Sequence, residues 1–531
     1  MPLFLSVLSG VLAGFSFPKH GFAVFAWVAY VPLLFSVRLA KGSKPVLKSY
    51  QYGFVSGFIT NIILLYWVVV AMNRYGNIGM PASILGLVLL AGILSVLYYG
   101  TFTMIIKLFW STKIPGELLF IPVVWVLLEY LKTYLFSGFP WELLGYSQYK
   151  NLPLIQISRV TSVYGVSCVV MLFNVLIYEF TVWWYDINTV RTAKYPFLFA
   201  KTIAVLLLIT GILVYGDITI DNTNELVRRT GNDIDVGLIQ GNIDQSHKWD
   251  PAYQRETMAS YFSLTRQAYE KSNLQLGIWP ETATPFFLQS EPVYMAQMSD
   301  FVRSHNLYML FGSPAYEYTN RGIDYFNSAF VMAPSGAIIG RYDKRHLVPF
   351  GEYLPLKHIF FFLKKLTGSI GDFTAGGEDN LLQFNNIKIG TLICYEIIFP
   401  QLSASDCRNG SNLLVTITDD AWFGDTSAPY QHLSMATFRA VEDERFVLRA
   451  ANTGISAVIS PTGKILDSTK LFVPAFIDYR VKLINTKTFY TVHGDVFILL
   501  CAIIFFLFTA YYIYNRLTLR ERIKEVPNFS L

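Results

Sequence analysis

Apolar residues are unevenly distributed along this chain. Long apolar runs fill most of the first 215 residues and return near residue 495, whereas the region between them alternates short apolar runs with polar stretches. A helix needs about 20 apolar residues to cross a bilayer. The pattern therefore predicts eight membrane segments, near residues 2–17, 21–38, 52–73, 81–106, 116–136, 158–184, 197–215 and 495–515. The first lacks a basic flank and another apolar run follows at once, so we expect a membrane helix and not a cleaved signal peptide.

The region from about 220 to 490 has a different pattern. Short apolar runs predict strands at 234–239, 275–279, 307–311, 327–333, 387–393, 412–417 and 455–460. Longer mixed stretches predict helices at 252–272, 291–305, 396–408 and 432–450. Strands that alternate with helices are typical of the α/β class. We therefore expect one soluble α/β domain between the seventh and eighth membrane segments.

Composition and charge support a membrane protein. The chain is 53% hydrophobic and only 15% charged, whereas soluble proteins carry about 25% charged residues. Loops on the cytoplasmic side carry an excess of Lys and Arg. With a cytoplasmic N-terminus, one side collects Arg38, Lys41, Lys44, Lys48, Lys107, Lys113, Arg191, Lys194, Lys201, Arg516, Arg520, Arg522 and Lys524. Residues 216–494 then lie on the far side, which in a bacterium is the periplasm.

These patterns divide the chain into three parts. We expect a bundle of seven transmembrane helices over 1–218, a periplasmic catalytic domain over 219–490, and an eighth helix with a cytoplasmic tail over 491–531. The net charge of +5 is modest, and the polar region has no dense Lys/Arg stripe interleaved with aromatic residues. The sequence therefore does not predict a nucleic-acid partner.

The stretch that ends in Cys394 is the main candidate for chemistry. An alternating apolar run over 387–393 precedes Cys394, and a helix-compatible stretch follows up to Cys407. This pattern predicts a strand, a sharp turn and a helix whose N-terminus would favour the thiolate. A buried core cysteine is the commoner role of a lone Cys, and a disulfide between Cys394 and Cys407 is a further alternative. No CxxC or His-rich spacing indicates a metal site.

Two other stretches favour a chemical role for Cys394. Glu281 follows Trp-Pro at the end of an apolar run, and Lys344 lies in the charged run 341–346 with a partly apolar turn after it. Taken alone, Glu281 is an ordinary helix-start carboxylate and a charged run is usually a solvated loop. The preceding Trp279-Pro280 at a strand end makes Glu281 less ordinary, and the partly apolar run after residue 346 indicates that the loop of Lys344 turns inward.

The order Glu281, Lys344, Cys394 in these settings resembles the nitrilase superfamily. Further motifs narrow the resemblance: Gly-Asn-Ile with Lys248-Trp249, Pro-Phe-Gly-Glu352-Tyr, and Asp-Ala-Trp422-Phe423-Gly. With its membrane segments, the chain from about Phe15 to the last segment resembles the apolipoprotein N-acyltransferase family. The resemblance implies a nitrilase-like α-β-β-α sandwich inserted before the last helix of an eight-helix transmembrane bundle.

The resemblance also implies roles for individual residues. Acyl transfer through a covalent intermediate needs a nucleophile, a proton acceptor and an oxyanion stabiliser, which would be Cys394, Glu281 and Lys344. Glu352 matches a second glutamate of the superfamily that would hold Lys344 charged and oriented. Glu396 matches a family position and either serves this network or favours the helix N-terminus.

Aromatic residues near these motifs are candidates for substrate binding. Trp249, Tyr395, Trp422 and Phe423 would line the path of the acyl chain and headgroup, with core or interface packing as the alternative. Trp141, which follows the fifth segment, fits a portal facing the catalytic domain, and an interfacial aromatic belt is its alternative.

Two further features of the polar region carry predictions. The family more often has Asn where this chain has Asp419, which places a second carboxylate near the site. The stretch 356–380 combines Phe360-Phe-Phe-Leu-Lys364-Lys365 with several glycines. A loop of exposed Phe and Lys that faces a membrane predicts a lid.

The resemblance implies a two-step reaction without cofactor or metal. A glycerophospholipid gives an acyl chain to Cys394, and the N-terminal amine of diacylglyceryl-cysteine on an apolipoprotein then takes it as an amide, which completes lipoprotein maturation. We expect a monomer embedded in the bilayer of a bacterial inner membrane.

Three alternatives remain at this point. A membrane-tethered amidase would use the same three residues with water as acceptor, although an anchor needs one helix. A lipid or lipoprotein transporter would carry an inactive domain, but the segments show no clear inverted repeat. Ser/His/Asp hydrolysis would use His346 or His432, but the sequence has no Gly-x-Ser-x-Gly, and we expect both histidines in loops or at the surface.

Overall fold

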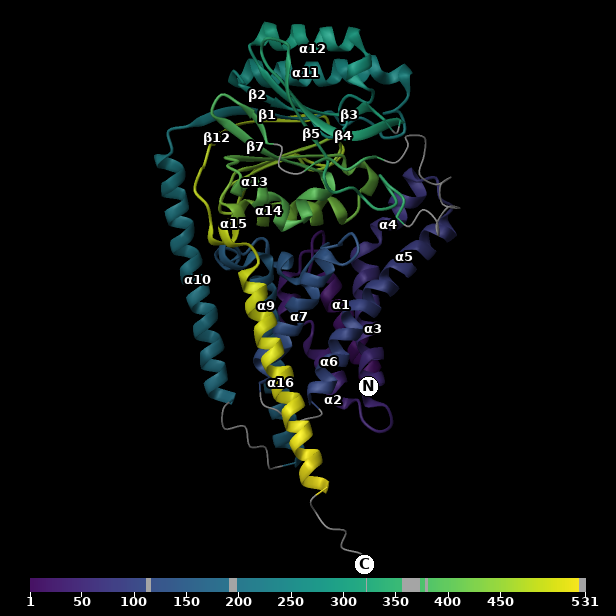
Figure 1. The fold of residues 1–531 in the computed structure, drawn as a ribbon, viewed down its shortest axis with the longest axis vertical. Helices are drawn as coiled ribbons and strands as arrows, with labels where there is room; N and C mark the ends of the chain where they lie inside the picture. Colours follow the sequence, from purple (N-terminus) through teal and green to yellow (C-terminus); the bar gives the residue numbers. More distant parts are fainter. Residues whose placement is uncertain (111–115, 191–197, 321, 356–372, 378–380, 525–531) are drawn as a thin grey trace, which may run out of the picture.

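The computed structural model describes residues 1–110, 116–190, 198–320, 322–355, 373–377 and 381–524. A bundle of helices forms one end of the molecule and two stacked β-sheets with covering helices form the other (Figure 1). The last helix, α16, returns from the sheets and runs beside the bundle, so both ends of the chain belong to the helical part (Figure 1).

Helices occur in all eight segments predicted from apolar runs. The bundle and its flanks consist of α1 (Pro2–Phe15), α2 (Val31–Leu39), α3 (Pro45–Leu65), α4 (Trp67–Val70), α5 (Met80–Leu94), α6 (Thr101–Trp110), α7 (Glu117–Tyr134), α8 (Leu152–Ile155), α9 (Ser158–Val190), α10 (Leu198–Arg229) and α16 (Val496–Lys524). Their positions along the chain follow the hydropathy pattern, because each predicted segment is an apolar run long enough to form a helix.

The described residues contain four helical stretches long and apolar enough to cross a membrane: Met80–Trp110, Ser158–Trp184, Leu198–Arg229 and Val496–Thr518. The pair α3 and α4, bent by 48°, forms a fifth if it is one broken span. The first two predicted segments form shorter apolar helices, and α7 carries Glu117, Glu129 and Lys132. The number of eight spans therefore stays a prediction.

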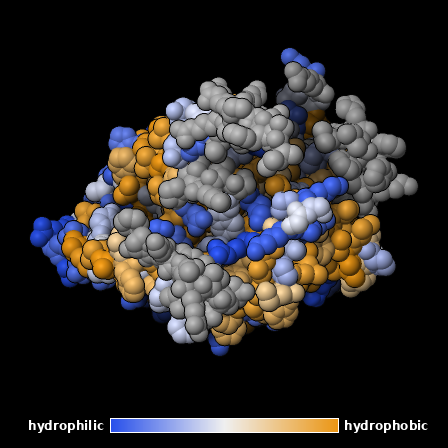
Figure 2. Space-filling view, turned by 90° about the horizontal axis from the view of Figure 1, so that it is seen from below, coloured by the Kyte–Doolittle hydropathy of each residue, from blue (hydrophilic) through white to orange (hydrophobic). Residues whose placement is uncertain are grey.

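The outer surface of the bundle has the character expected against lipid. Large apolar side chains are exposed along α10 and α16, among them Phe199, Leu207, Phe506 and Leu507. Seen from the end of the bundle, apolar residues cover much of the rim of the molecule (Figure 2). Exposed apolar surface of this extent indicates a non-aqueous environment.

The polar region folds as two six-stranded sheets packed face to face. The first has the order β12-β1-β2-β3-β4-β5 and the second β11-β10-β9-β8-β7-β6. The strands are β1 (Asp233–Gln240), β2 (Leu276–Ile278), β3 (Tyr308–Thr319), β4 (Gly322–Met332), β5 (Ile338–Asp343), β6 (Leu382–Phe384), β7 (Ile387–Ile393), β8 (Leu413–Thr418), β9 (Val447–Ala451), β10 (Ala457–Ile459), β11 (Ile465–Ser468) and β12 (Ala475–Lys482). The parallel strands β1, β2 and β3 and the parallel strands β7, β8 and β9 form the two centres.

Helices cover both outer faces of this sandwich. In Figure 1, α11 (Gln254–Ser272) and α12 (Pro292–His305) lie on the far side from the bundle, whereas α13 (Pro400–Arg408), α14 (Ala428–Asp443) and α15 (Phe489–His493) lie between the sheets and the bundle. The predicted α/β class and the α-β-β-α layering are confirmed.

One predicted element is wrong in its second half. The sequence predicts a helix over 432–450, but α14 ends at Asp443 and Glu444 takes a left-handed conformation that stops it. Residues Val447–Ala451 form β9, which is buried over its whole length between β8 and β10. A fully buried strand has no alternation, so its pattern alone does not distinguish it from a buried helix.

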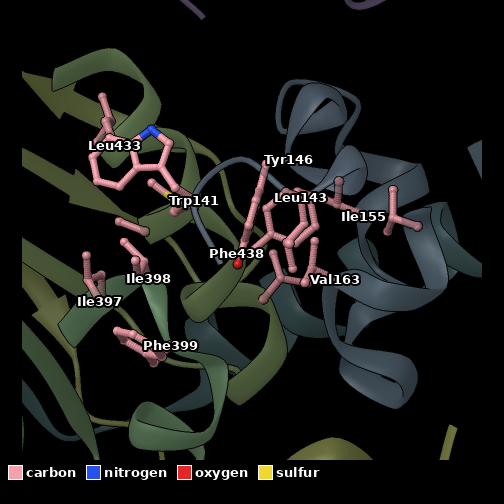
Figure 3. Close-up of a cluster of buried hydrophobic side chains, with 14 of the residues drawn as sticks. Trp141, Leu143, Tyr146, Ile155, Val163, Ile397, Ile398, Phe399, Leu433 and Phe438 are labelled. Atoms are coloured by element: carbon pink, nitrogen blue, oxygen red, sulfur yellow. The ribbon is translucent and has the colours of Figure 1, made fainter. Parts of the chain in front are cut away.

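The bundle and the sandwich share a hydrophobic core. Figure 3 shows Trp141, Leu143 and Tyr146 of the bundle beside Ile397, Ile398, Phe399, Leu433 and Phe438 of the sandwich, all in one buried cluster. The two parts therefore pack as a continuous interior, which holds the sandwich against the membrane end.

Candidate active site

Cys394 lies at a sharp turn after a central strand. It follows β7 and opens the short 3₁₀ helix η8 (Cys394–Ile398), with α13 beginning only at Pro400. Its φ is +53°, a left-handed conformation that costs a non-glycine residue about 1–3 kcal/mol and persists where surrounding contacts enforce it. The residue as a whole is partly buried at the strand end.

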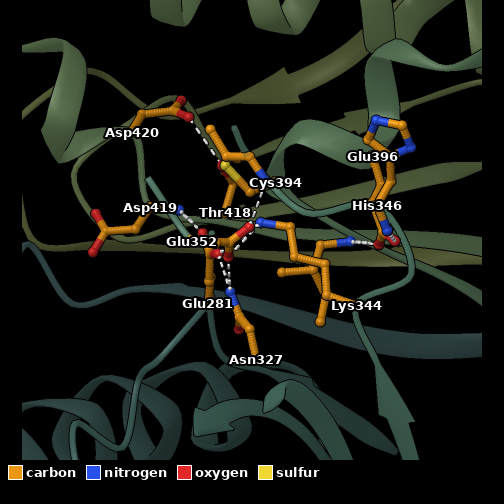
Figure 4. Close-up of polar contacts among 12 residues, drawn as sticks. Glu281, Asn327, Lys344, His346, Glu352, Cys394, Glu396, Thr418, Asp419 and Asp420 are labelled. Atoms are coloured by element: carbon orange, nitrogen blue, oxygen red, sulfur yellow. Dashed lines mark hydrogen bonds and ion pairs between the residues drawn. The ribbon is translucent and has the colours of Figure 1, made fainter. Parts of the chain in front are cut away.

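Glu281 and Lys344 converge on the same place from the other sheet. Glu281 follows β2 by three residues, and Lys344 directly follows β5. Lys344 Nζ lies 3.6 Å from Glu281 Oε1, and Figure 4 shows both side chains beside Cys394. β2 and β5 run in the same direction in one sheet, with β3 and β4 between them. Their carboxyl ends therefore lie on the same side of that sheet, and residues far apart in sequence form one site.

A second carboxylate completes the surroundings of Lys344. Its Nζ donates a hydrogen bond to Glu352 Oε1 at 2.9 Å, and Asn327 Nδ2 bridges Glu281 Oε1 at 2.7 Å and Glu352 Oε1 at 2.8 Å. Burial alone would lower the pKa of the buried Lys344 ammonium, but Glu352 and Glu281 outweigh it and raise that pKa. Lys344 is therefore a fixed cation at the site, as predicted for an oxyanion stabiliser.

The environment of Cys394 favours the neutral thiol. Burial raises the pKa of the thiol, Glu281 raises it further, and Lys344 only partly opposes them. The expectation that a helix N-terminus favours the thiolate is wrong, because a five-residue 3₁₀ turn follows Cys394 and a carboxylate faces it. A neutral thiol needs a base when it attacks.

Glu281 is suited to be that base. Burial raises the pKa of its carboxyl, whereas Lys344 and a hydrogen bond from Asn327 lower it. Its other oxygen, Oε2, accepts a hydrogen bond from the backbone N–H of Asp419 at 2.9 Å. Gly312 on β3 is packed so tightly that a Cβ there would lie 2.7 Å from the Glu281 Cα, so the backbone of the base is fixed as well.

Glu396 organises the turn that carries Lys344 and Cys394. This fully buried carboxylate accepts hydrogen bonds from Arg345 N at 2.7 Å and Ile393 N at 2.7 Å. It also accepts from His346 N at 3.0 Å and from the Tyr342 hydroxyl at 2.9 Å. Glu396 thereby ties the residue before the nucleophile to the two residues after Lys344.

The predicted aromatic residues fall into two groups. Trp141 is buried, and its ring stacks on His432 with centroids 5.7 Å apart. Phe423 packs against Trp67 and Trp141, and the Tyr395 hydroxyl donates to Gly138 O at 3.0 Å. These three connect the sandwich to the bundle, whereas Trp249 and Trp422 are 39% and 42% exposed.

His432 is buried behind Cys394, although we expected it in a loop or at the surface. Its Nε2 lies 3.1 Å from the carbonyl oxygen of Cys394, and its Nδ1 lies 3.1 Å from Arg449 Nη2. Burial, with the Arg449 charge, lowers the pKa of the imidazole, and Nδ1 also lies 3.2 Å from Asp420 Oδ1, which opposes that shift. The expected surface position of His432 is wrong, because a single histidine in a helical stretch carries no local signal of burial.

Asn327 was also missed by sequence reasoning, since it lies inside an apolar strand, β4, without a motif. The unusual Asp419 forms a buried ion pair with Lys248, so its charge is balanced. Cys394 and Cys407 are free thiols.

Most of the predicted lid, residues 356–372 and 378–380, lies outside the described residues. In the part of the chain that the structure describes, no group of His, Cys, Asp and Glu is arranged to hold a metal ion.

Comparisons with known proteins first define the class. The family model described as carbon-nitrogen hydrolase matches residues 235–473, the two-sheet domain with the Glu-Lys-Cys cluster. This domain is therefore of the nitrilase-like α/β type. The model described as apolipoprotein N-acyltransferase N-terminal domain matches residues 9–176, in the helical part.

Relatives over nearly the full length define the family. An apolipoprotein N-acyltransferase of Geobacter metallireducens is 42% identical over 94% of this chain and 92% of its own length. One from Methylococcus capsulatus is 34% identical over 93% and 92%. This chain belongs to the apolipoprotein N-acyltransferase family. It is a bacterial membrane enzyme that N-acylates lipoproteins. The amidase and transporter alternatives are not favoured.

Solved structures that are similar to the sandwich have low identity. Saccharomyces cerevisiae Nit3, a member of branch 10 of the nitrilase superfamily, shares 18% identity and covers 48% of this chain and 91% of its own with a TM-score of 0.38. A carbon-nitrogen hydrolase of Helicobacter pylori shares 16% identity over 47% and 89%, with a TM-score of 0.37.

Proposed function

We propose that this enzyme takes its acyl group from a glycerophospholipid and carries it as a thioester on Cys394. The observation that supports this most directly is the convergence of a neutral thiol, a buried carboxylate and a fixed ammonium at one strand edge. Such a set provides a nucleophile, a base and an oxyanion stabiliser.

In the first half-reaction, Glu281 takes the Cys394 proton as sulfur attacks the ester carbonyl. The Lys344 ammonium stabilises the tetrahedral oxyanion. Its collapse breaks the ester C–O bond, and Glu281 returns the proton to the leaving alkoxide of the lysophospholipid. Glu352 and Asn327 hold Lys344 and Glu281 in place through their hydrogen bonds.

In the second half-reaction, the α-amine of a diacylglyceryl-cysteine attacks the thioester carbonyl. Glu281 removes a proton from the attacking amine, and Lys344 again stabilises the oxyanion. The C–S bond breaks, Cys394 recovers its proton and the apolipoprotein leaves as an amide. Trp141, Trp249, Tyr395, Trp422 and Phe423 would line the lipid path, because they lie around this strand edge or at the contact with the bundle.

Intact-protein mass spectrometry tests the thioester. The enzyme is incubated with a synthetic dioleoyl glycerophospholipid in detergent and without acceptor. Wild type should gain one acyl mass that neutral hydroxylamine removes, and Cys394→Ala should gain none. Cys407→Ala is the matched control, since Cys407 is a buried thiol on α13 that forms no part of the cluster. Acyl transfer by Cys394→Ala at the wild-type rate would refute the proposal.

We further propose a monomer with eight spans in the inner membrane, with the bundle at 1–218, a periplasmic domain at 219–490 and the last helix with its tail at 491–531. The Lys- and Arg-rich loops on one side support this orientation. A membrane-impermeant maleimide applied to spheroplasts should label Tyr318→Cys, which is exposed on β3. It should label Ser43→Cys, in the basic loop after α2, only after permeabilisation. The reverse pattern would exclude this topology.

A further inference from the structure

The buried ion pair between Lys248 and Asp419 has no part in the two half-reactions, although it adjoins the base. Lys248 lies in the loop after β1 and is 2% exposed, and Asp419 directly follows β8 and is 3% exposed. The two side chains form a salt bridge. An ion pair removed from water is costly unless its geometry is good and its remaining polar atoms are satisfied, so its location next to Glu281 needs a reason.

Both partners of the pair contact Glu281. Lys248 Nζ donates to the Glu281 carbonyl oxygen at 3.2 Å, and Asp419 N donates to the Glu281 carboxylate at 2.9 Å. Lys248 therefore holds the main chain of Glu281, and Asp419 holds its carboxylate. A shift of either loop would move the base.

Further contacts fix the Asp419 side chain itself. Its Oδ1 accepts from Asn452 Nδ2 at 3.2 Å and from Ala421 N at 3.2 Å. Asn452, which follows β9, also donates to Ile243 O at 2.9 Å in the loop that leads to Lys248. The loops after β1, β2, β8 and β9 thus meet at one network centred on the ion pair.

We propose that Lys248 and Asp419 are positioning residues that hold Glu281 and, as a pair of opposite charges, keep its basicity suited to the reaction. The proposal rests on Glu281 being the base of the proposed function. Their contacts with the site are to Glu281 and not to Cys394, so each acts through Glu281.

The sign of the effect follows from the charges that face Glu281. These are Lys344 and Glu352 from β5 and the loop after it, Cys394 from the turn after β7, Asp419 after β8, and Lys248 from the loop after β1. Burial raises the pKa of Glu281, Lys344 lowers it, and Glu352 and Asp419 raise it. Loss of one member of the ion pair leaves the charge of the other uncompensated beside the base.

The two single variants should therefore shift the base in opposite directions. Asp419→Asn leaves the Lys248 cation unbalanced, so the pKa of Glu281 falls and activity survives to lower pH. Lys248→Met leaves the Asp419 anion unbalanced, so the pKa of Glu281 rises. As the pH is lowered, activity then begins to fall at a higher pH than in wild type. Each shift of the acid limb should be about one pH unit, the lower end of what a close charge produces. The double variant restores the balance and should return the limb toward wild type.

The experiment is the pH dependence of single-turnover acylation of the full-length enzyme. The rate of acyl-mass gain with the dioleoyl phospholipid is measured from pH 4 to pH 9 for wild type, both single variants and the double variant. Arg159→Met is the control, because it removes a buried cation that pairs with Glu444 at 2.5 Å away from the cluster. That variant should lower stability without moving the acid limb.

The outcomes separate this inference from the proposed function. If wild type forms no adduct on Cys394, the proposed function fails first. If wild type shows an acid limb and the two single variants move it in the same direction, or not at all, the ion pair has only a structural role and the inference is overturned. Opposite shifts with recovery in the double variant support it, since a general loss of stability would not change sign.

Discussion

Glu396 shows how much one buried carboxylate controls in this molecule. It accepts hydrogen bonds from three backbone N–H groups and one hydroxyl, and burial raises its pKa against the opposing charge of Arg345. Hydrogen bonds to a charged group contribute about 1.5–3 kcal/mol each when a partner would otherwise be left unsatisfied. The side chain therefore sets the relative position of Lys344 and Cys394 through backbone hydrogen bonds on both sides.

Glu396→Gln should damage both activity and stability. The amide keeps the size of the side chain but replaces one acceptor oxygen by a donor NH₂ group, which then faces donors such as Ile393 N–H. We expect single-turnover acylation to fall by roughly 10²-fold, the effect of a misplacement near 1 Å, and the unfolding free energy to fall by about 2 kcal/mol. Acylation kinetics and thermal unfolding in detergent measure the two effects.

An exposed carboxylate offers the comparison for this variant. Glu317 pairs with Arg341 at the surface of the sandwich, where a salt bridge is worth about 0–1 kcal/mol. Glu317→Gln should leave both quantities nearly unchanged. Wild-type acylation in Glu396→Gln would mean that the turn after β7 holds its shape without this carboxylate.

The helix α10 shows how close packing constrains a whole element. A Cβ at Gly216 would lie 1.9 Å from the carbonyl oxygen of Pro153, whereas a Cβ at Gly211, in the same helix, has no atom within 4 Å. The backbone of α10 therefore touches α8 at Gly216, and this contact fixes where the helix leaves the bundle and enters the sandwich.

Gly216→Ala and Gly211→Ala should consequently have opposite effects. Alanine is favoured over glycine in a helix by about 1 kcal/mol, so Gly211→Ala should be neutral or stabilising. Gly216→Ala forces α10 away from α8 and should lower the unfolding temperature by several degrees. Thermal unfolding of both variants in detergent distinguishes them, and equal stability of the two would show that α10 is not held at Pro153.

At the scale of the whole molecule, a buried polar contact joins the bundle to the sandwich, so we expect the two parts to unfold together. Glu442 on α14 of the sandwich accepts from Arg439 Nε at 2.6 Å, and it also accepts from Ser162 Oγ at 2.6 Å and Val163 N at 2.9 Å on α9. The side chains of Glu442 and Arg439 are both fully buried. Val163, whose backbone N–H takes part in this contact, belongs to the shared hydrophobic core (Figure 3).

Glu442→Gln should weaken both parts together. Breaking a buried ion pair by neutralising one partner costs about 3–5 kcal/mol. Two buried free thiols report on the two parts, Cys407 in the sandwich and Cys501 on α16. Their reactivity toward a maleimide should appear at one common temperature in wild type and at one common lower temperature in the variant.

An exposed acidic residue serves as the control for this experiment. Glu225 pairs with Arg228 and Arg229 near the end of α10, where the side chains are largely exposed. Glu225→Gln should leave both thiols protected to the wild-type temperature. Separate transitions for Cys407 and Cys501 would show that the two parts unfold independently.

Local patterns predicted most of the elements and the main chemical groups. The runs at 234–239, 387–393 and 412–417 form β1, β7 and β8. A strand that packs in the core of a sandwich needs apolar side chains, and these are visible in the sequence. Glu281 and Cys394 each follow such a run, whereas Lys344 lies in a charged run with a partly apolar turn after it. Their clustering is confirmed by the geometry, and their catalytic roles remain proposals until the thioester is measured.

Elements without a distinct local pattern were not predicted. β5 and β12 contain charged residues, and β9 was taken for part of a helix, because edge strands and fully buried strands lack simple alternation. The number of membrane spans is open for a similar reason. Short or charged helices such as α1 and α7 depend on their neighbours and not on their own hydropathy.

The linear order of residues thus established the kind of protein: apolar segments long enough for a membrane, an α/β domain between them, and a Glu-Lys-Cys set in recognisable surroundings. Hydrophobic periodicity is a local property, so it is legible in the sequence. Only the tertiary structure decides which side chains form hydrogen bonds and ion pairs around the Glu-Lys-Cys set. Asn327, His432 and the pair of Lys248 with Asp419 come from different strands and loops. The order of the strands in two sheets brings them together, and that order depends on the packing of the whole chain.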